Sequence, residues 1–186
     1  WLYQLPLGVV GIAMGVVLLP ALSRFLKAED AEGSKAALSR SAEIALTLTI
    51  PASVALLVVP FPIVSVLFER GAATVDDTAA IAVAVSIYAV GLPAFVLQKI
   101  LQPVFFARED TVRPFRYAVV SMIANAALAV GLAPFIGWLA PAIATTLAAW
   151  LMVALLGVGA QRYGDVIRFD ARFHKRIWRI LIASAI

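Results

Sequence analysis

The chain alternates between long apolar runs and short polar links. Five runs, each of about 20 residues or more, are separated by links that are rich in charged residues, glycine and proline. About 20 apolar residues are needed for a helix to cross the hydrocarbon core of a bilayer. The pattern therefore predicts five membrane-spanning helices, at about residues 2–22, 44–68, 79–106, 115–136 and 142–160.

The links complete this picture of an all-α, polytopic transmembrane helix bundle over residues 1–160. A short polar helix at about residues 31–43 is expected to lead into the second span. Residues 161–176 are expected to form a basic cytoplasmic link, and residues 177–186 are expected to form the start of a sixth span. The chain opens without Met on one apolar run and stops inside another, so we interpret it as a piece of a longer protein.

Composition excludes an ordinary water-soluble domain. The chain is 63% hydrophobic and 14% charged, whereas soluble domains are about 25% charged. Cysteine is absent and His174 is the one histidine, so we expect no metal site, no disulfide and no cofactor. No phosphate-binding glycine loop or nucleophile elbow is present, and no carboxylate or histidine lies inside a predicted span. We therefore expect no catalytic residue and no enzyme.

The basic residues predict an orientation. Lys and Arg number 4, 1, 3, 0 and 6 in the five successive links, counting Arg179 with the fifth. Cytoplasmic links carry an excess of Lys and Arg, so the first, third and fifth links are expected in the cytoplasm. The net charge of +4 thus reflects topology, and no nucleic-acid partner is expected. The basic run at residues 168–179 has two interpretations. It either lies on the anionic head groups of the membrane surface or only sets the orientation of the neighbouring spans.

Lys99 is the strongest functional candidate. It lies inside the third predicted span, about two turns from the cytoplasmic end, with Gln98 and Gln102 beside it. A charged side chain at the centre of a membrane costs about 2.5–3.5 kcal/mol on the insertion scale, so such residues usually face a polar cavity. One interpretation is a cation that lines a path for an anionic substrate. The other is a lysine that reaches to the cytoplasmic interface.

Other polar residues inside the spans are weaker candidates. Gln4 and Asn125 are included with Lys99, Gln98 and Gln102 as residues that could line a substrate path. For Asn125, and more clearly for Thr145 and Thr146, the favoured interpretation is a hydrogen bond that joins two helices. The charged pairs in the links, Asp76–Asp77 and Glu109–Asp110 among them, are interpreted as helix caps and solvated groups.

Several segments together resemble the MurJ/MviN family of lipid II flippases, in the MOP exporter superfamily. The resemblance begins with Tyr3-Gln4-Leu5-Pro6-Leu7-Gly8-Val9 and Leu19-Pro20-Ala21-Leu22-Ser23-Arg24. It continues with Leu67-Phe68-Glu69-Arg70-Gly71 and then Asp77-Thr78. It ends with Tyr88-Ala89-Val90-Gly91-Leu92-Pro93-Ala94-Phe95, Lys99, Pro103, Phe106-Ala107-Arg108-Glu109-Asp110-Thr111 and Pro114. These segments keep the family's order and spacing along the whole chain.

The resemblance implies a fold of fourteen helices in two lobes, of which this chain would supply most of the C-terminal lobe. It implies alternating-access transport of undecaprenyl-pyrophosphate-linked peptidoglycan precursor, lipid II, across the bacterial inner membrane during cell-wall biogenesis. The expected partners are this precursor, membrane lipids and the missing N-terminal lobe of the same protein.

The sequence departs from the family pattern where Trp1 stands in place of a common arginine of the cavity, and Gln4 in place of a frequent acidic residue. The alternative function is that of another exporter of the superfamily, for a polysaccharide-linked lipid or for drugs.

Overall fold

The computed structural model describes residues 8, 18–25, 27–28, 30–68 and 75–161. Residues 18–25 are helical. The remaining helices are α2 (Ala31–Val58), α3 (Pro60–Phe68), α4 (Val75–Phe106), α5 (Val112–Ile136) and α6 (Ala140–Gln161), with a 3₁₀ turn η1 (Gly137–Leu139) between the last two. Most of the predicted first span, the basic link and the predicted start of a sixth span lie outside the described residues.

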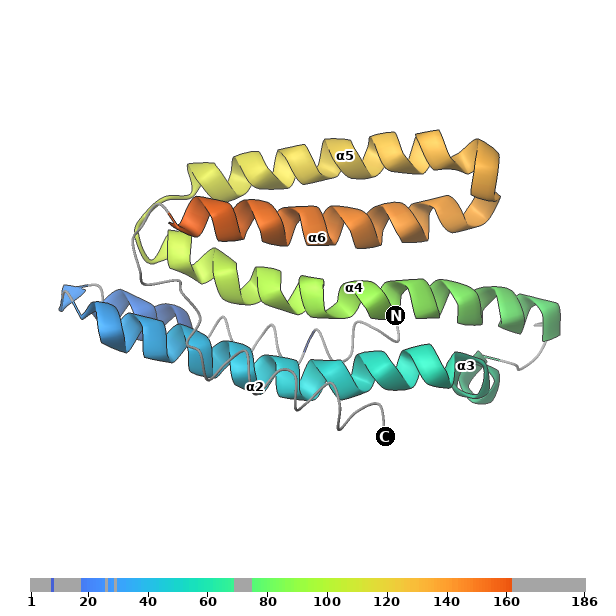
Figure 1. Ribbon diagram of the computed structural model, residues 1–186, viewed down its shortest axis with the longest axis horizontal. Coiled ribbons are helices and arrows are strands. Elements are labelled where there is room, and N and C mark those ends of the chain that lie inside the picture. The colour runs from blue at the N-terminus through green and yellow to red at the C-terminus, as the bar shows by residue number, and fades with distance from the viewer. Residues whose placement is uncertain (1–7, 9–17, 26, 29, 69–74, 162–186) are drawn as a thin grey trace.

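The predicted all-helical class is confirmed for the part of the chain that the structure describes. Three segments are long and apolar enough to cross a membrane, Glu32–Val58, Val75–Phe106 and Val112–Gln161. The third consists of α5, η1 and α6, which run side by side in opposite directions (Figure 1). At 25 and 22 residues, α5 and α6 each exceed the length of about 20 residues that a single crossing needs.

Helix α2 differs from the expected arrangement at both ends. It begins at Ala31, where the Asp30 carboxylate accepts a hydrogen bond of 2.8 Å from the backbone N–H of Gly33, and it continues without a break to Val58. The expected polar helix at 31–43 and the first part of the second span are thus one helix. The range 44–68 in turn holds two helices, because Pro60 disfavours helical geometry at Val59, which takes φ −125° and ψ 47°. Beyond this break α3 turns away from the axis of α2 (Figure 1).

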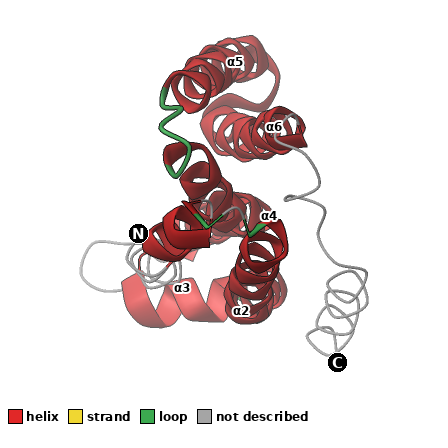
Figure 2. Ribbon diagram, turned by 90° about the vertical axis from the view of Figure 1, so that its left-hand side faces the viewer, coloured by secondary structure: helices red, strands yellow, loops and turns green. Residues whose placement is uncertain are grey.

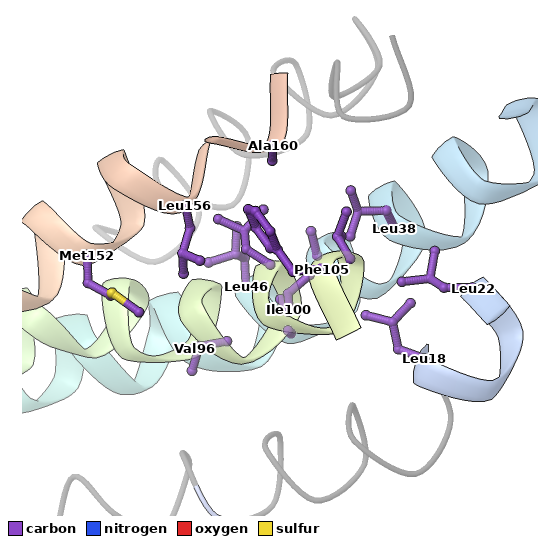
Figure 3. Close-up of a cluster of buried hydrophobic side chains, with 14 of the residues drawn as sticks. Leu18, Leu22, Leu38, Leu46, Val96, Ile100, Phe105, Met152, Leu156 and Ala160 are labelled. Atoms are coloured by element: carbon purple, nitrogen blue, oxygen red, sulfur yellow. The ribbon is translucent and has the colours of Figure 1, made fainter. Parts of the chain in front are cut away.

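Helix α4 lies between α2 and α6, and α5 covers the far side of α6 (Figures 1 and 2). The main core forms where α2, α4 and α6 meet, near the end of α4. Leu46, Ile100, Phe105 and Leu156 are all buried there, and Leu18 and Leu22 join the same cluster (Figure 3). This contact fixes residues 18–25 against the end of α4.

Polar and apolar residues are distributed as in a membrane protein. Thr49 and Ser34 are fully buried, and each hydroxyl donates to a carbonyl one turn earlier, of Ala45 and Asp30 respectively. Large apolar side chains point outward instead, including Phe135 of α5 at 83% exposure. Such an outer surface is unfavourable in water and suits contact with lipid.

The basic residues gather at one end of the bundle, which we call the basic end. It is formed by residues 18–25 and 27, the start of α2, the end of α4, the start of α5 and the end of α6 (Figure 1). In the described ranges every Lys and Arg except Lys99 belongs to this end, namely Arg24, Lys27, Lys35, Arg40, Arg108, Arg113 and Arg116. The folded arrangement therefore places the first and third links together, as the predicted orientation requires.

This arrangement predicts which residues face the cytoplasm. The chain has no cysteine, so Glu32→Cys and Asp76→Cys each introduce a single thiol, at the basic end and the opposite end respectively. We expect a membrane-impermeant maleimide to label Asp76→Cys in intact cells, and Glu32→Cys only after permeabilisation, because basic links stay in the cytoplasm. Labelling of Glu32→Cys in intact cells would contradict the orientation.

A second prediction concerns the contact between α5 and α6. A Cβ atom on Gly159 would collide with the ring and hydroxyl of Tyr117, which itself packs edge-on against Phe105 at 6.3 Å between ring centroids. Gly159→Ala should therefore destabilise the fold by about 1–3 kcal/mol through overpacking. Gly157→Ala is the matched control, since nothing lies within 4 Å of a Cβ there. Thermal denaturation in detergent should give a lower Tm for Gly159→Ala than for the unaltered protein, and an unchanged Tm for Gly157→Ala. Equal Tm values for the two variants would contradict the packing.

Candidate functional site

A polar pocket of about 310 Å³ lies between α4, α5 and α6. Its polar side chains come from all three helices, and we call it the three-helix pocket. The polar lining residues are Gln98, Gln102, Ser121, Asn125 and Thr145. The remaining lining residues are Phe95, Ala118, Met122, Ala148, Ala149 and Met152. The pocket therefore lies within the apolar length of three long helices.

Small residues let α4 and α6 approach closely beside this pocket. Helix α6 presents a buried series of alanines to its neighbours, including Ala144, Ala148 and Ala149. At Gly91 of α4, a Cβ atom would lie 3.1 Å from the hydroxyl oxygen of Thr146. Without a hydrophobic driving force between helices in lipid, such close packing supplies much of the association energy.

Two side chains of the pocket are used to join helices. The Gln98 Nε2 atom donates to the carbonyl oxygen of Ala149 at 3.0 Å, and the Ser121 hydroxyl donates to that of Ala148 at 2.7 Å. Successive carbonyls of α6 thus receive one side chain from α4 and one from α5. These two bonds hold α4 and α5 on either side of α6, with the pocket between them.

The two remaining amide side chains of the pocket, those of Gln102 and Asn125, do not join helices. Neither Gln102 nor Asn125 makes a side-chain hydrogen bond to any residue in the part of the chain that the structure describes, although both line the pocket. The predicted helix-joining bond of Asn125 is therefore not found there. The prediction is confirmed for Thr146, whose hydroxyl donates to the Ile87 carbonyl of α4 at 3.1 Å. Thr145 instead donates to Pro141 within its own helix.

The structure separates Lys99 from the three-helix pocket. Lys99 is exposed and does not line it, since successive residues of a helix point about 100° apart. Its helical neighbours Phe95 and Gln102, one turn on either side, do line it. Lys99 thus lies at the border of the pocket. Measured along the axis of α4, it is about 10 Å from Phe106, the last residue of the helix. Of the remaining predicted site residues, the pocket unites Gln98, Gln102 and Asn125, and Gln4 lies outside the described residues.

Among the polar lining residues, Ser121 is the one that the sequence analysis did not consider. It lies one helical turn before Asn125, and this i, i+4 spacing places the two side chains on one face of α5. The spacing was the available signal. A lone serine inside an apolar run carries little weight without knowledge of what that face contacts.

The lining determines what the pocket can do. Amide and hydroxyl groups can donate and accept hydrogen bonds, and none of the lining residues carries a charge. The arrangement suits an uncharged polar group, or the edge of a larger ligand whose charged part meets Lys99. It lacks a titratable side chain for proton transfer.

Carboxylates lie at the starts of α4 and α5. The Asp110 carboxylate accepts a hydrogen bond of 3.1 Å from the backbone N–H of Arg113 and lies 3.3 Å from its guanidinium Nε. This contact confirms the predicted capping role at the start of α5. Asp76 and Asp77 lie exposed in the first turn of α4, where the helix dipole favours negative charge.

The chain is similar to known proteins along its whole length. A family model described as "Lipid II flippase MurJ" matches residues 1–186. The probable lipid II flippases MurJ of Rhizobium tropici and Rhizobium meliloti are 42% and 44% identical to it over 185 residues. These 185 residues are 100% of this chain and 34% of each relative, so the chain spans about a third of their length.

A solved structure also matches. It is titled "Lipid II flippase MurJ, inward closed conformation", and it superposes with a TM-score of 0.82 at 25% sequence identity. The match covers 98% of this chain and 37% of that chain.

The hydrogen bonds of the three-helix pocket predict that its two glutamines differ in their effect on stability. Gln98→Leu removes a bond between helices, so we expect it to lower the free energy of unfolding by about 0.6 kcal/mol. Gln102→Leu is the control, because this side chain has no partner among the described residues. Unfolding of both variants by denaturing detergent measures the difference. A larger loss for Gln102→Leu than for Gln98→Leu would contradict the assignment.

Proposed function

Because this chain belongs to the family of the lipid II flippase MurJ, we propose that it forms part of a transporter of lipid-linked peptidoglycan precursor in the bacterial inner membrane. The family consists of membrane transporters rather than enzymes. The chain itself is a membrane protein with several candidate transmembrane helices. Since it spans about a third of its relatives' length, transport is proposed for a full-length protein that carries it.

The chain would form most of the C-terminal lobe of a two-lobed, fourteen-helix transporter, with five spans and the start of a sixth. The antiparallel arrangement of α4, α5 and α6 and the common basic end support successive membrane spans, and the choice of the C-terminal lobe rests on the motifs that resemble the family. Rocking of this lobe against an N-terminal lobe would alternately open a central path to the two sides of the membrane.

The substrate path would pass along the border between Lys99 and the three-helix pocket. The observation that carries this proposal is the convergence of Gln98, Gln102 and Asn125 on one pocket, with Lys99 exposed beside it at apolar depth. The pyrophosphate of the precursor is anionic, so a cation at this depth offsets its cost of leaving water. Unpartnered amides can donate hydrogen bonds to phosphate or sugar oxygens. The lipid tails would remain in the surrounding hydrocarbon.

One observation favours a second candidate, another exporter of the superfamily. The three-helix pocket is lined by neutral groups, which suits a sugar or a neutral polar molecule as well as a pyrophosphate. Under this alternative Lys99 would serve the cytoplasmic interface and not the substrate.

Complementation tests both candidates. In cells depleted of their own flippase, the full-length gene should restore growth, and Lys99→Ala should reduce the transport rate by about ten- to a hundredfold, since a hydrogen bond to a charged group contributes about 1.5–3 kcal/mol. Lys35→Ala is the control, because it removes the same charge from the basic end. Undiminished growth with Lys99→Ala would remove Lys99 from the mechanism. Failure of the unaltered gene to restore growth would count against lipid II transport itself.

A further inference from the structure

The backbone hydrogen bonding of α4 is interrupted near the middle of the helix. Pro93 lies inside α4 and has no N–H group, so the carbonyl of Ala89, four residues earlier, loses its usual donor within the helix. Ala89 is fully buried. A buried carbonyl without a donor is unfavourable, above all in hydrocarbon, where water cannot replace the missing bond. The interruption therefore requires a donor from another helix.

Ser53 of α2 supplies this donor. Its hydroxyl donates to the Ala89 carbonyl at 2.9 Å, and the residue is 5% exposed. Hydroxyl groups inside helices often donate to a carbonyl of their own helix one turn earlier, as those of Thr49 and Ser86 do. Ser53 instead reaches across to α4, at the carbonyl that Pro93 leaves without a backbone donor. The bond between the two helices thus replaces the bond that the proline removes.

The same turn of α4 is also attached to α6. The Thr146 hydroxyl donates to the Ile87 carbonyl at 3.1 Å, and the Trp150 Nε1 atom donates to the Val90 carbonyl at 3.2 Å. Gly91 belongs to this turn, and a residue without a Cβ atom adds conformational freedom to the backbone. Side chains of two neighbouring helices therefore hold a turn whose own backbone bonding is incomplete.

The two halves of α4 on either side of this turn are packed differently. Residues 94–106 contribute several large side chains to the main core, Ile100 among them. Residues 75–88 bury only Thr78 and Ala82 against the part of the chain that the structure describes. The first half of α4 is therefore the less firmly packed, and a change of angle at the turn would move it relative to the second half.

We propose that residues 89–93 form a hinge in α4, and that the Ser53 hydroxyl is the latch that holds this hinge at its present angle. In an unbroken helix successive backbone bonds resist bending, whereas at Pro93 the missing bond is replaced by a side chain of α2. One hydrogen bond between helices in a membrane changes an equilibrium about threefold on average, and about twentyfold at most. The latched and unlatched conformations are thus close enough in free energy to exchange without unfolding.

The hinge has a consequence for transport that rests on the proposed function. The first half of α4 extends from the end opposite the basic end towards the three-helix pocket, and the second half carries Gln98, Lys99 and Gln102. The angle between the halves would therefore alter access to these residues from that end. The hinge itself does not depend on which substrate the protein transports.

Distances between pairs of spin labels in the full-length protein test the hinge. The chain has no cysteine, so labels are attached at introduced cysteines in a full-length background without others. Val83→Cys in the first half of α4 is paired with Phe135→Cys at the end of α5, and both positions are exposed. Double electron–electron resonance in lipid nanodiscs gives the distance distribution. We expect Ser53→Ala to increase the population of a second distance about threefold, because it removes one hydrogen bond between helices.

Two variants and a second label pair are the controls. Ser86→Ala removes a hydroxyl that donates within α4 itself, so it should leave the distribution unchanged. Pro93→Ala restores the missing backbone donor, and in this background Ser53→Ala should have no effect on the distance. The label pair Phe135→Cys and Val158→Cys, on α5 and α6, should not respond to Ser53→Ala.

Three outcomes would overturn the proposal. An unchanged distribution for Ser53→Ala would show that its hydroxyl is not a latch. An equal effect of Ser53→Ala in the Pro93→Ala background would show that Ser53 acts through packing alone. An equal effect of Ser86→Ala would indicate a general loosening of α4, and this comparison decides the result if Pro93→Ala does not fold. Failure of complementation together with the expected distances would count against transport and leave the hinge in place.

Discussion

The contact between α4 and α6 positions every other part of the described fold. Three side chains cross it and each donates to a backbone carbonyl, from Thr146 to Ile87, from Trp150 to Val90 and from Gln98 to Ala149. Two of the donors belong to α6 and one belongs to α4, and neither helix can rotate about its axis without breaking a bond. In hydrocarbon no water can replace such bonds, and close packing of small residues must supply the remaining attraction. The alanines of α6 and Gly91 of α4 allow that packing.

The three-helix pocket is a consequence of this contact. Helix α5 packs on α6 and hardly touches α4, because Ser121 and the close approach of Tyr117 to Gly159 attach it to α6. A space therefore remains where α4 and α5 flank α6, and Gln102 and Asn125 line it. The same contact turns Lys99 outward at the border of this space. Adjacent polar residues of one helix are thus placed differently, since Gln98 is bonded to α6 and Lys99 is exposed.

Charge distinguishes the three-helix pocket from the basic end of the bundle. The three-helix pocket has a neutral lining and lies within the apolar length of the helices, whereas every Lys and Arg of the described ranges except Lys99 lies at the basic end. Lys99 lies at the level of the three-helix pocket, about two turns of α4 before its end at Phe106. Under the proposed function, an anionic head group that approaches the basic end would meet a positively charged surface first and neutral hydrogen-bonding groups afterwards.

The sequence by itself determined the helical class, the approximate positions of the long helices and the gathering of cations at alternate links. These features follow from local rules, since a run of apolar residues must satisfy its backbone internally and Lys and Arg stay out of hydrocarbon. The sequence also indicated Gln98, Gln102 and Asn125 as candidate pocket residues, because a polar side chain inside an apolar span is energetically unfavourable unless it faces a polar environment. Other features depended on the tertiary structure.

Only the tertiary structure separated Lys99 from Gln98, identified Ser121 as a partner of α6, and joined Ser53 to the carbonyl that Pro93 leaves without a backbone donor. It also showed that residues 31–58 form one helix that ends before Pro60. Helical periodicity predicts which residues of one helix share a face. It does not predict which face contacts which neighbouring helix, because that depends on how the side chains of distant segments fit together.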